Sequence, residues 1–171
     1  MPAHSIAVIA GDGIGKEVMP EGQRVLEAAG RRFGIELEWT EFPWDSSDFE
    51  TTGRIMPADG IARLAPFEAI YLGAVGIPSV PDHVSLWGML IPIRREFLQY
   101  VNLRPVRLFD GVTSPLAGKT PVDIDFYVVR ENVEGEYSEI GGRLYAGTED
   151  ELVVQQSVFT RKGCDRIIRY A

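Results

Sequence analysis

Short apolar runs alternate with amphipathic stretches along the first part of the chain. Residues 5–10 form an apolar run that stops at glycines, and residues 16–33 then place apolar side chains at helical spacing. Residues 35–42 alternate between apolar and polar positions, residues 59–64 predict a short helix, and residues 68–75 form another apolar run. This strand–helix–strand order predicts an α/β fold with a largely parallel sheet covered by helices.

Strand patterns dominate after about residue 101. Residues 102–109, 124–129 and 152–160 are each typical of a strand, and glycines interrupt the stretch between the last two. We therefore predict that the second part of the chain is richer in strands than the first.

Pro92 sets the expected start of a helix between these two parts. Proline fits the first turn of a helix but not its interior, which predicts a helix from about Ile91 to Tyr100. Arg104 precedes a proline and is therefore biased towards an extended conformation. The last residues predict a helix with Ile167 on its apolar side.

Composition and charge exclude several classes of protein. The chain has 171 residues, of which 45% are apolar, and its formal charge of -8 argues against nucleic-acid binding. No apolar run reaches the roughly 18 residues of a membrane span, and the first residues lack the pattern of a signal peptide. We therefore expect a cytoplasmic protein. The lone Cys164 has no partner for an internal disulfide and is expected to be a small buried apolar residue.

Three arginines stand out in this acidic chain because each lies where an extended or helical segment is expected to end. They are Arg94, Arg104 and Arg130, and Tyr137 follows the last of them by seven residues. A guanidinium binds a carboxylate with two parallel hydrogen bonds, so three of them in one cleft predict a site for a small dicarboxylate. Taken singly, Arg94 and the adjacent Arg95 are more typical of the exposed face of a helix.

A glycine-rich loop, GDGIGK, joins the first strand to the first helix. Gly15 follows Gly13 by two positions, which departs from the dinucleotide fingerprint, and the spacing also differs from the phosphate loop of nucleotide triphosphatases. The loop is compatible with anion binding at a helix N-terminus or with glycines that only permit a turn. A conventional dinucleotide-binding fold, with Glu41 as its acidic residue, is a weaker alternative.

Four strings carry a family resemblance: GDGIG, YLGAVGIPSVPDHVSLWG, IRREFLQYVNLRPVR and DFYVVRENVEGEYS. Together they resemble the β-decarboxylating dehydrogenases, which act on isocitrate, isopropylmalate, tartrate and D-malate, and most of all the D-malate and tartrate branch. The resemblance implies an isocitrate/isopropylmalate dehydrogenase-like α/β fold that is incomplete, with residues 1–100 in the cofactor-side lobe and 101–171 at the start of an interface lobe. It also implies an arm at about 138–158 that contacts the second subunit of a homodimer.

The same resemblance implies roles for individual residues. Arg94, Arg104 and Arg130 would bind the substrate carboxylates, and Tyr137 would protonate the enol that remains after carbon dioxide departs. Residues expected beside the nicotinamide of the cofactor are Gly11, Asp12, Gly13, Ile14 and Gly73. Residues expected to select the substrate are Ser85, Trp87, Leu90 and Ile91.

The implied reaction is the NAD-dependent oxidative decarboxylation of a small 2-hydroxy dicarboxylate, either D-malate to pyruvate and carbon dioxide or tartrate. Family members supply a lysine base and the aspartate ligands of Mg²⁺ or Mn²⁺ from sequence beyond the matched segment, so no metal ligand is assigned here. We therefore expect a truncated half that associates and lacks turnover by itself. The alternatives are an isopropylmalate dehydrogenase and a non-catalytic dicarboxylate-binding or regulatory subunit.

Overall fold

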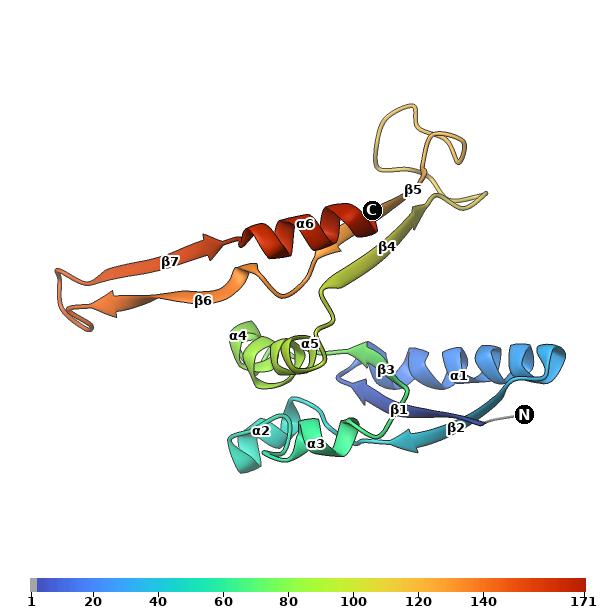
Figure 1. Cartoon of the computed structure of the whole chain (residues 1–171), viewed down its shortest axis with the longest axis horizontal. Coiled ribbons are helices and arrows are strands. Elements are labelled where there is room, and N and C mark those ends of the chain that lie inside the picture. The colour runs from blue at the N-terminus through green and yellow to red at the C-terminus, as the bar shows by residue number, and fades with distance from the viewer. Residues whose placement is uncertain (1–2) are drawn as a thin grey trace. The chain divides into compact units, whose positions relative to one another are not determined.

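The computed structural model describes residues 3–171, which form two compact units (Figure 1). The first unit ends at Ile93, and the second spans Arg94–Ala171. Helices and strands alternate in the first unit, and strands predominate in the second. The predicted α/β class is therefore confirmed, whereas the proposed functional division at residue 100 stays a prediction.

The first unit is built around a small parallel sheet. Its elements are β1 (Ala3–Gly11), α1 (Ile14–Phe33), β2 (Glu36–Glu41), α2 (Ser47–Thr52), α3 (Gly60–Leu64), β3 (Ala69–Ala74), α4 (Asp82–Ser85) and a π-helix η1 (Leu86–Leu90). Helix α5 (Ile91–Glu96) begins in this unit and crosses its boundary after Ile93. The strand order is β2-β1-β3 with both pairings parallel. Helix α1 packs along this sheet, and Ala7, Val8 and Ile9 of the central strand are fully or almost fully buried. The predicted parallel sheet is confirmed.

Helix α1 begins and ends at glycines. Its N-cap is Gly13, and its C-cap is Gly34, whose backbone is left-handed with φ of 71°. Ile35 N donates to the carbonyl oxygen of Gly30 at 2.9 Å, which closes the last turn before β2 begins. The periodic run that predicted a helix over 16–33 therefore identified this element to within two residues at its start.

The segment around Pro92 differs from the prediction. Helix α5 begins at Ile91 as expected, but it ends at Glu96 rather than near Tyr100. It continues directly from α4 and η1, neither of which the sequence predicted. Ile91 N–H donates to the carbonyl oxygen of Leu86, a π-type hydrogen bond that lies just before Pro92. Because Pro92 has no N–H to donate, this wider turn accommodates it within the helical segment.

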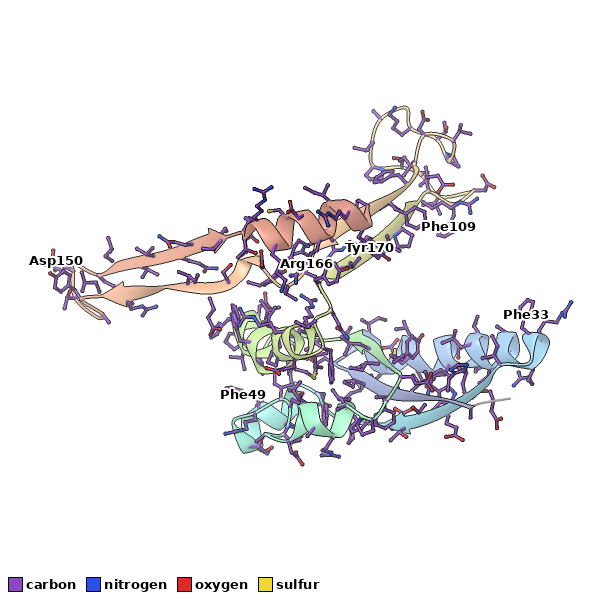
Figure 2. All side chains as sticks on the ribbon, viewed as in Figure 1. Phe33, Phe49, Phe109, Asp150, Arg166 and Tyr170 are labelled. Carbon is purple, nitrogen blue, oxygen red and sulfur yellow. The ribbon has the colours of Figure 1, made fainter. Side chains whose placement is uncertain are left out.

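The second unit begins with residues 94–96 of α5 and then contains two antiparallel strand pairs and one whole helix. Its elements are β4 (Val101–Arg107), β5 (Asp125–Glu131), β6 (Gly135–Leu144), β7 (Leu152–Val158) and α6 (Arg161–Tyr170). Strand β4 pairs with β5, and β6 pairs with β7 in a hairpin whose turn contains Asp150 (Figure 2). Strand β6 was not predicted because its two adjacent glycines, Gly141 and Gly142, weaken the strand pattern.

The end of β7 corrects a boundary. The predicted strand ran to Thr160, but β7 ends at Val158 and Thr160 is the N-cap of α6. The Thr160 hydroxyl accepts from Gly163 N at 3.0 Å, which satisfies one of the free donors of the first turn. Cys164 is half-buried in this helix rather than buried. Among residues 3–171, none of the helices has the length and apolar character needed to cross a membrane.

Candidate functional site

The antiparallel pairing of β4 and β5 determines which face carries the polar side chains of the second unit. Asn102 is paired with Arg130, and Arg104 is paired with Val128. Paired residues in an antiparallel sheet point to the same face, and so do residues two apart on one strand. Arg104 and Arg130 therefore share one face of this strand pair.

The side chain of Tyr137 contacts two of the predicted arginines. Arg130 Nη2 donates to Tyr137 Oη at 2.6 Å, and the Arg130 guanidinium carbon lies 5.2 Å from the centre of the phenol ring. The Arg94 guanidinium carbon lies 5.7 Å from the same ring centre. The predicted association of Arg94, Arg130 and Tyr137 is therefore present as a geometric cluster.

The two guanidinium groups change the acidity of the phenol. The hydrogen bond from Arg130 is the largest cause that lowers the pKa of Tyr137 below its ordinary value of 10.0, and the charges of Arg130 and Arg94 add to it. Partial burial of the ring opposes this shift. The result is a tyrosine that releases its proton more readily than a tyrosine in water.

Arg104 lies outside this cluster. Its Nε donates to Asn102 Oδ1 at 3.2 Å, and its side chain is exposed. Asn102 Nδ2 in turn lies 3.4 Å from Asn132 Oδ1, and Asn132 Nδ2 donates to the carbonyl oxygen of Gln99 at 3.0 Å. The structure thus brings together two of the three predicted arginines, and the substrate role of the third stays a prediction.

A cavity of about 370 Å³ lies beside Arg130 and Tyr137. Its other lining residues are Glu131, Glu134, Gly135, Glu136, Ser157 and Phe159. Arg94 is the other arginine at the Tyr137 ring. Its Nη1 atom is buried and has no hydrogen-bond partner among the described residues. A buried donor in this state is costly unless a ligand or water accepts from it.

Glu131, directly after Arg130, binds the start of the next segment and helix α6. Its Oε2 accepts from Val133 N at 2.9 Å and from Glu134 N at 2.7 Å, while its Oε1 accepts from Arg166 Nη2 at 2.8 Å. Burial opposes ionisation, but the Glu134 N–H and the Arg166 guanidinium together hold the pKa of Glu131 below its usual range. This ion pair fixes the end of β5, and therefore Arg130, against α6.

Glu134 makes a second connection to the same helix. Its carboxylate accepts from Thr160 N at 2.9 Å and from Thr160 Oγ1 at 2.7 Å. A Cβ at position 163 would overlap this carboxylate, which explains the glycine in the first turn of α6. Glu131 and Glu134 were not predicted as supporting residues, although both occur in the RENVEGEY string that contains Arg130 and Tyr137.

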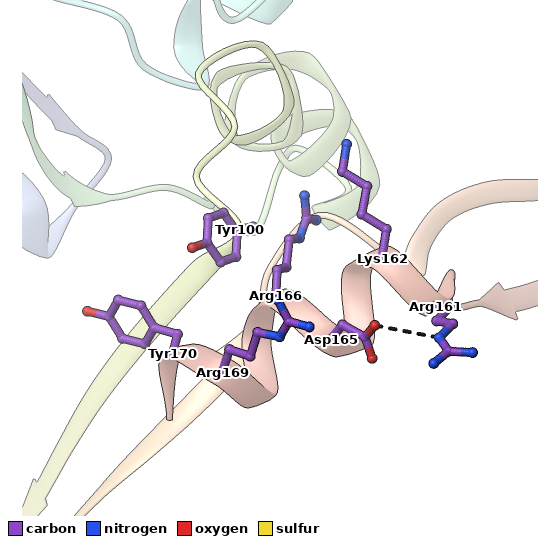
Figure 3. A pocket seen from close by; sticks show the side chains of 7 residues that line it. All are labelled: Tyr100, Arg161, Lys162, Asp165, Arg166, Arg169 and Tyr170. Carbon is purple, nitrogen blue, oxygen red and sulfur yellow. Dashed lines mark ion pairs between the residues drawn. The ribbon is translucent and has the colours of Figure 1, made fainter.

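A larger cavity of about 770 Å³ lies along α6 (Figure 3). Its lining residues are Tyr100, Arg161, Lys162, Asp165, Arg166, Arg169 and Tyr170. Arg161 pairs with Asp165 at 3.6 Å, and the Arg166 guanidinium carbon lies 4.7 Å from the centre of the Tyr100 ring. The surface is rich in basic side chains, and no sequence motif had indicated it.

In the first unit, close packing explains most of the glycines that were predicted to border the cofactor. A Cβ at Gly11 would overlap the carbonyl oxygen of Ala74, and a Cβ at Gly73 would overlap that of Ala10. Gly13 has open space around its Cα and a φ of 42°. Gly13 and Ile14 are exposed at the start of α1, so these two residues remain candidates for contact with a cofactor.

Asp12 is buried and bonded to two other loops. Its Oδ1 accepts from Ser46 N at 2.7 Å, and its Oδ2 accepts from Ser46 Oγ at 2.5 Å and from Gly76 N at 2.6 Å. The carboxylate therefore joins the loops that follow β1, β2 and β3. We assign Asp12 a structural role, and its predicted role at the cofactor stays untested.

The four residues predicted to select the substrate differ in exposure. Ile91 is buried in the core of the first unit, and the hydroxyl of the buried Ser85 donates to the carbonyl oxygen of Asp82 at 3.0 Å. Trp87 and Leu90 are half-buried. Trp87 and Leu90 thus present accessible surface for a direct contact with a substrate, and the specificity role of all four residues stays a prediction.

Among residues 3–171 no group of three or more His, Cys, Asp or Glu side chains is arranged to hold a metal ion. Two carboxylates that precede Tyr137 in the sequence, Glu131 and Glu134, are already bonded to Arg166 and Thr160. The described residues therefore do not fit a complete site for Mg²⁺ or Mn²⁺.

Known proteins with the same pattern are enzymes named for D-malate and tartrate. The chain is 62% identical over 173 aligned residues to the decarboxylating D-malate dehydrogenase of Escherichia coli, and 58% identical over 175 to a tartrate dehydrogenase/decarboxylase of Pseudomonas putida. Both alignments cover 100% of this chain and 48% of the relative. The chain thus spans about half the length of the curated relatives it matches.

Solved structures agree with this assignment. An isocitrate dehydrogenase from Methylococcus capsulatus superimposes with a TM-score of 0.77 at 27% identity, covering 98% of this chain and 46% of that one. A β-decarboxylating dehydrogenase from Thermococcus kodakarensis gives a TM-score of 0.59 at 28% identity, covering 98% and 44%. The sequence model of the isocitrate/isopropylmalate dehydrogenase family matches residues 5–171. The predicted fold is therefore confirmed, and the chain belongs to the isocitrate/isopropylmalate dehydrogenase family.

Proposed function

We propose that this chain binds a small 2-hydroxy dicarboxylate, D-malate or tartrate, and contributes the proton donor for its oxidative decarboxylation. The names of relatives that are 62% and 58% identical over the whole chain support this substrate class. The observation that carries the proposal is the 2.6 Å hydrogen bond from Arg130 Nη2 to Tyr137 Oη.

Arg130 and Arg94 are the proposed carboxylate ligands. Arg130 borders the cavity beside Tyr137, and Arg94 carries a buried Nη1 that lacks an acceptor within the described chain. A substrate carboxylate would satisfy that donor with a charge-assisted hydrogen bond. Arg104, which shares a face with Arg130, is proposed as a third ligand that would exchange its bond to Asn102 for the substrate.

Tyr137 is the proposed acid. Oxidation at the hydroxyl-bearing carbon gives a 2-oxo acid, loss of carbon dioxide leaves an enol, and one proton must then be added to carbon. Because Tyr137 Oη accepts its hydrogen bond from Arg130, its own proton is free to point towards the substrate. The neighbouring positive charges stabilise the phenolate that remains, and the lowered pKa brings the acid closer to neutral pH.

NAD and a divalent cation are the proposed cofactors. When bound, NAD accepts the hydride that leaves the hydroxyl-bearing carbon. Gly13 and Ile14 are exposed at the start of α1 and are the residues of this chain proposed to contact it. The described residues do not form a metal site, and no step performed by this chain is assigned to a metal.

Trp87 and Leu90 are the proposed specificity residues. Both are half-buried on the helical segment that leads to Arg94. An apolar surface would tolerate an alkyl-substituted malate, which keeps isopropylmalate as the alternative substrate. A site that hydrogen-bonds the extra hydroxyl of tartrate would discriminate strongly against malate.

The β6–β7 hairpin is proposed as an arm that binds a second copy of the chain. Its exposed apolar side chains are Ile140, Leu144, Tyr145, Leu152, Val153 and Val154. An isolated two-stranded hairpin has little stability, and exposed apolar strands favour association. These exposed side chains support a homodimer.

A non-catalytic dicarboxylate-binding subunit is the competing function, since the two arginines at the Tyr137 ring would account for binding without turnover. Calorimetric titration with D-malate, followed by an assay of NAD reduction with Mn²⁺, tests both functions. We expect this chain to bind D-malate without reducing NAD. Reduction of NAD after addition of the separately expressed second half of a relative such as the E. coli enzyme would support the catalytic role, whereas binding without rescue would favour the subunit.

A further inference from the structure

Tyr137 lies in an irregular part of β6. Gly135 is paired with Val158, and the next pair is Ile140 with Gln156, so β6 advances five residues while β7 advances two. Residues 136–139 therefore have no partner in the β6–β7 ladder. This bulge displaces Tyr137 from a regular strand position.

Other contacts hold most of the bulge in place. Ser138 Oγ bonds the carbonyl oxygen of Gly135 at 2.5 Å and accepts from Val158 N at 3.3 Å. Gln155 Nε2 donates to the carbonyl oxygen of Glu136 at 3.2 Å. The carbonyl of Tyr137 itself needs a donor from elsewhere, because the ladder supplies none at this position.

Arg95 supplies that donor. Its Nη2 donates to the carbonyl oxygen of Tyr137, and its Nη1 donates to Glu139 Oε2 at 3.1 Å. Glu139 has a φ of 57°, a left-handed conformation that residues other than glycine rarely adopt. The Arg95 guanidinium therefore binds both the backbone of Tyr137 and the side chain of the strained Glu139.

We infer that Arg95 is a positioning residue for Tyr137, with a role different from that of its neighbour Arg94. Adjacent helical residues point about 100° apart, so Arg94 reaches the phenol ring while Arg95 reaches the backbone that carries it. This inference rests on the proposed function in one respect, namely that the phenol of Tyr137 is the acid. The sequence pattern around Arg95 had indicated only an exposed helix face.

By holding the backbone of Tyr137, Arg95 maintains the distance between Tyr137 Oη and Arg130. That hydrogen bond is 2.6 Å and is the largest cause that lowers the pKa of the phenol. Without Arg95, the bulge loses the donor to its central carbonyl and the ion pair to Glu139. The ring then moves relative to Arg130, and the phenol returns towards the acidity of free tyrosine.

The test is an NMR titration of the whole chain labelled with ¹³C at the tyrosine ζ carbon, with the Tyr137 signal assigned through Tyr137→Phe. We expect Arg95→Ala to raise the pKa of Tyr137 and Arg95→Lys to restore it in part, since an ammonium group pairs with Glu139 but lacks the planar fork. Arg130→Gln sets the upper limit of the shift. Arg107→Ala, at an exposed arginine on β4, is the matched control and should leave the titration unchanged.

An unchanged Tyr137 pKa in Arg95→Ala, with a clear rise in Arg130→Gln, would overturn the inference. If circular dichroism shows that Arg95→Ala does not fold, the Glu139→Gln variant is titrated instead. A rise in the pKa of Tyr137 in that variant supports the role of Arg95, and an unchanged pKa contradicts it. The titration needs no turnover and no substrate. Failure of the wild-type chain to bind D-malate would therefore count against the proposed function while leaving the positioning role of Arg95 tested separately.

Discussion

Arg130 donates a 2.6 Å hydrogen bond to the phenol oxygen of Tyr137, seven residues later in the chain. Strand β5 ends directly after Arg130, and a short turn held by Glu131 returns the chain to β6. Two residues that are close in sequence thus meet because the turn between them is fastened to α6.

The acidity of Tyr137 is expected to depend on Arg130. The folded pKa is lowered below 10.0, so the fold favours the phenolate, and the related stabilisation is fully present above the unfolded pKa. This stabilisation is lost as pH falls through the folded pKa. Ultraviolet difference titration against Tyr137→Phe should show Arg130→Gln titrating at higher pH than wild type.

The Glu131–Arg166 pair is expected to stabilise the second unit above acidic pH. The two side chains are only 10% and 23% exposed, and the folded pKa of Glu131 is lowered. Glu131→Gln should reduce the free energy of unfolding by about 2 kcal/mol at pH 7.

The pH dependence of this loss has a definite sign. A lowered carboxyl pKa gives stability that is present above the unfolded value and is lost as pH falls through the folded value. Urea unfolding at a series of pH values should therefore show wild type approaching Glu131→Gln in acid. Asp125→Asn, at an exposed pair with Arg107, is the control and should change little. Equal pH profiles for wild type and Glu131→Gln would contradict the assignment.

Gly163→Ala is expected to destabilise the chain although alanine is the better helix former. A Cβ at this position would overlap the Glu134 carboxylate, which holds Thr160 at the start of α6. Helix propensity alone would favour alanine by about 1 kcal/mol, so a net loss of roughly 1–2 kcal/mol in urea unfolding requires the steric conflict. Lys162→Ala, at the preceding exposed position, tests the helix without this conflict. A gain in stability for Gly163→Ala would show that Glu134 moves freely.

Asp12→Asn is expected to destabilise the first unit by about 2–3 kcal/mol. The buried carboxylate accepts from three donors, and an amide would place an N–H group against at least one of them. Thermal unfolding measures the loss, with the exposed Asp59→Asn as control. Wild-type stability in Asp12→Asn would mean that the three loops are held together by other contacts.

Sequence reasoning succeeded where local periodicity determines structure and where one motif contains the whole contact. Helix α1 and every strand except β6 follow from apolar spacing, and the Arg130–Tyr137 pair lies within one string. The helical segment before Pro92 was missed because a π turn accommodates the proline, which no local pattern indicates. The role of Arg95 was missed because it depends on a bulge in a strand more than forty residues away.

The homodimer is expected to depend on the exposed apolar side chains of the β6–β7 hairpin. Val153 is 61% exposed on β7, and a charge there should prevent close packing with a second copy. Light scattering after size exclusion should show Val153→Lys shifted towards the monomer relative to wild type. The matched control is Val122→Lys, at an exposed valine outside the hairpin. The same dimer fraction in all three proteins would exclude the hairpin as the interface.

The most direct measurement is calorimetric titration of the wild-type chain, Arg130→Gln and Arg107→Gln with D-malate. We predict one binding site in wild type, unchanged affinity in Arg107→Gln, and an affinity about 30-fold weaker in Arg130→Gln, which corresponds to about 2 kcal/mol for a lost charge-assisted pair. Equal affinity of Arg130→Gln and wild type, or the absence of D-malate binding by a folded wild-type chain, would contradict the proposed dicarboxylate site.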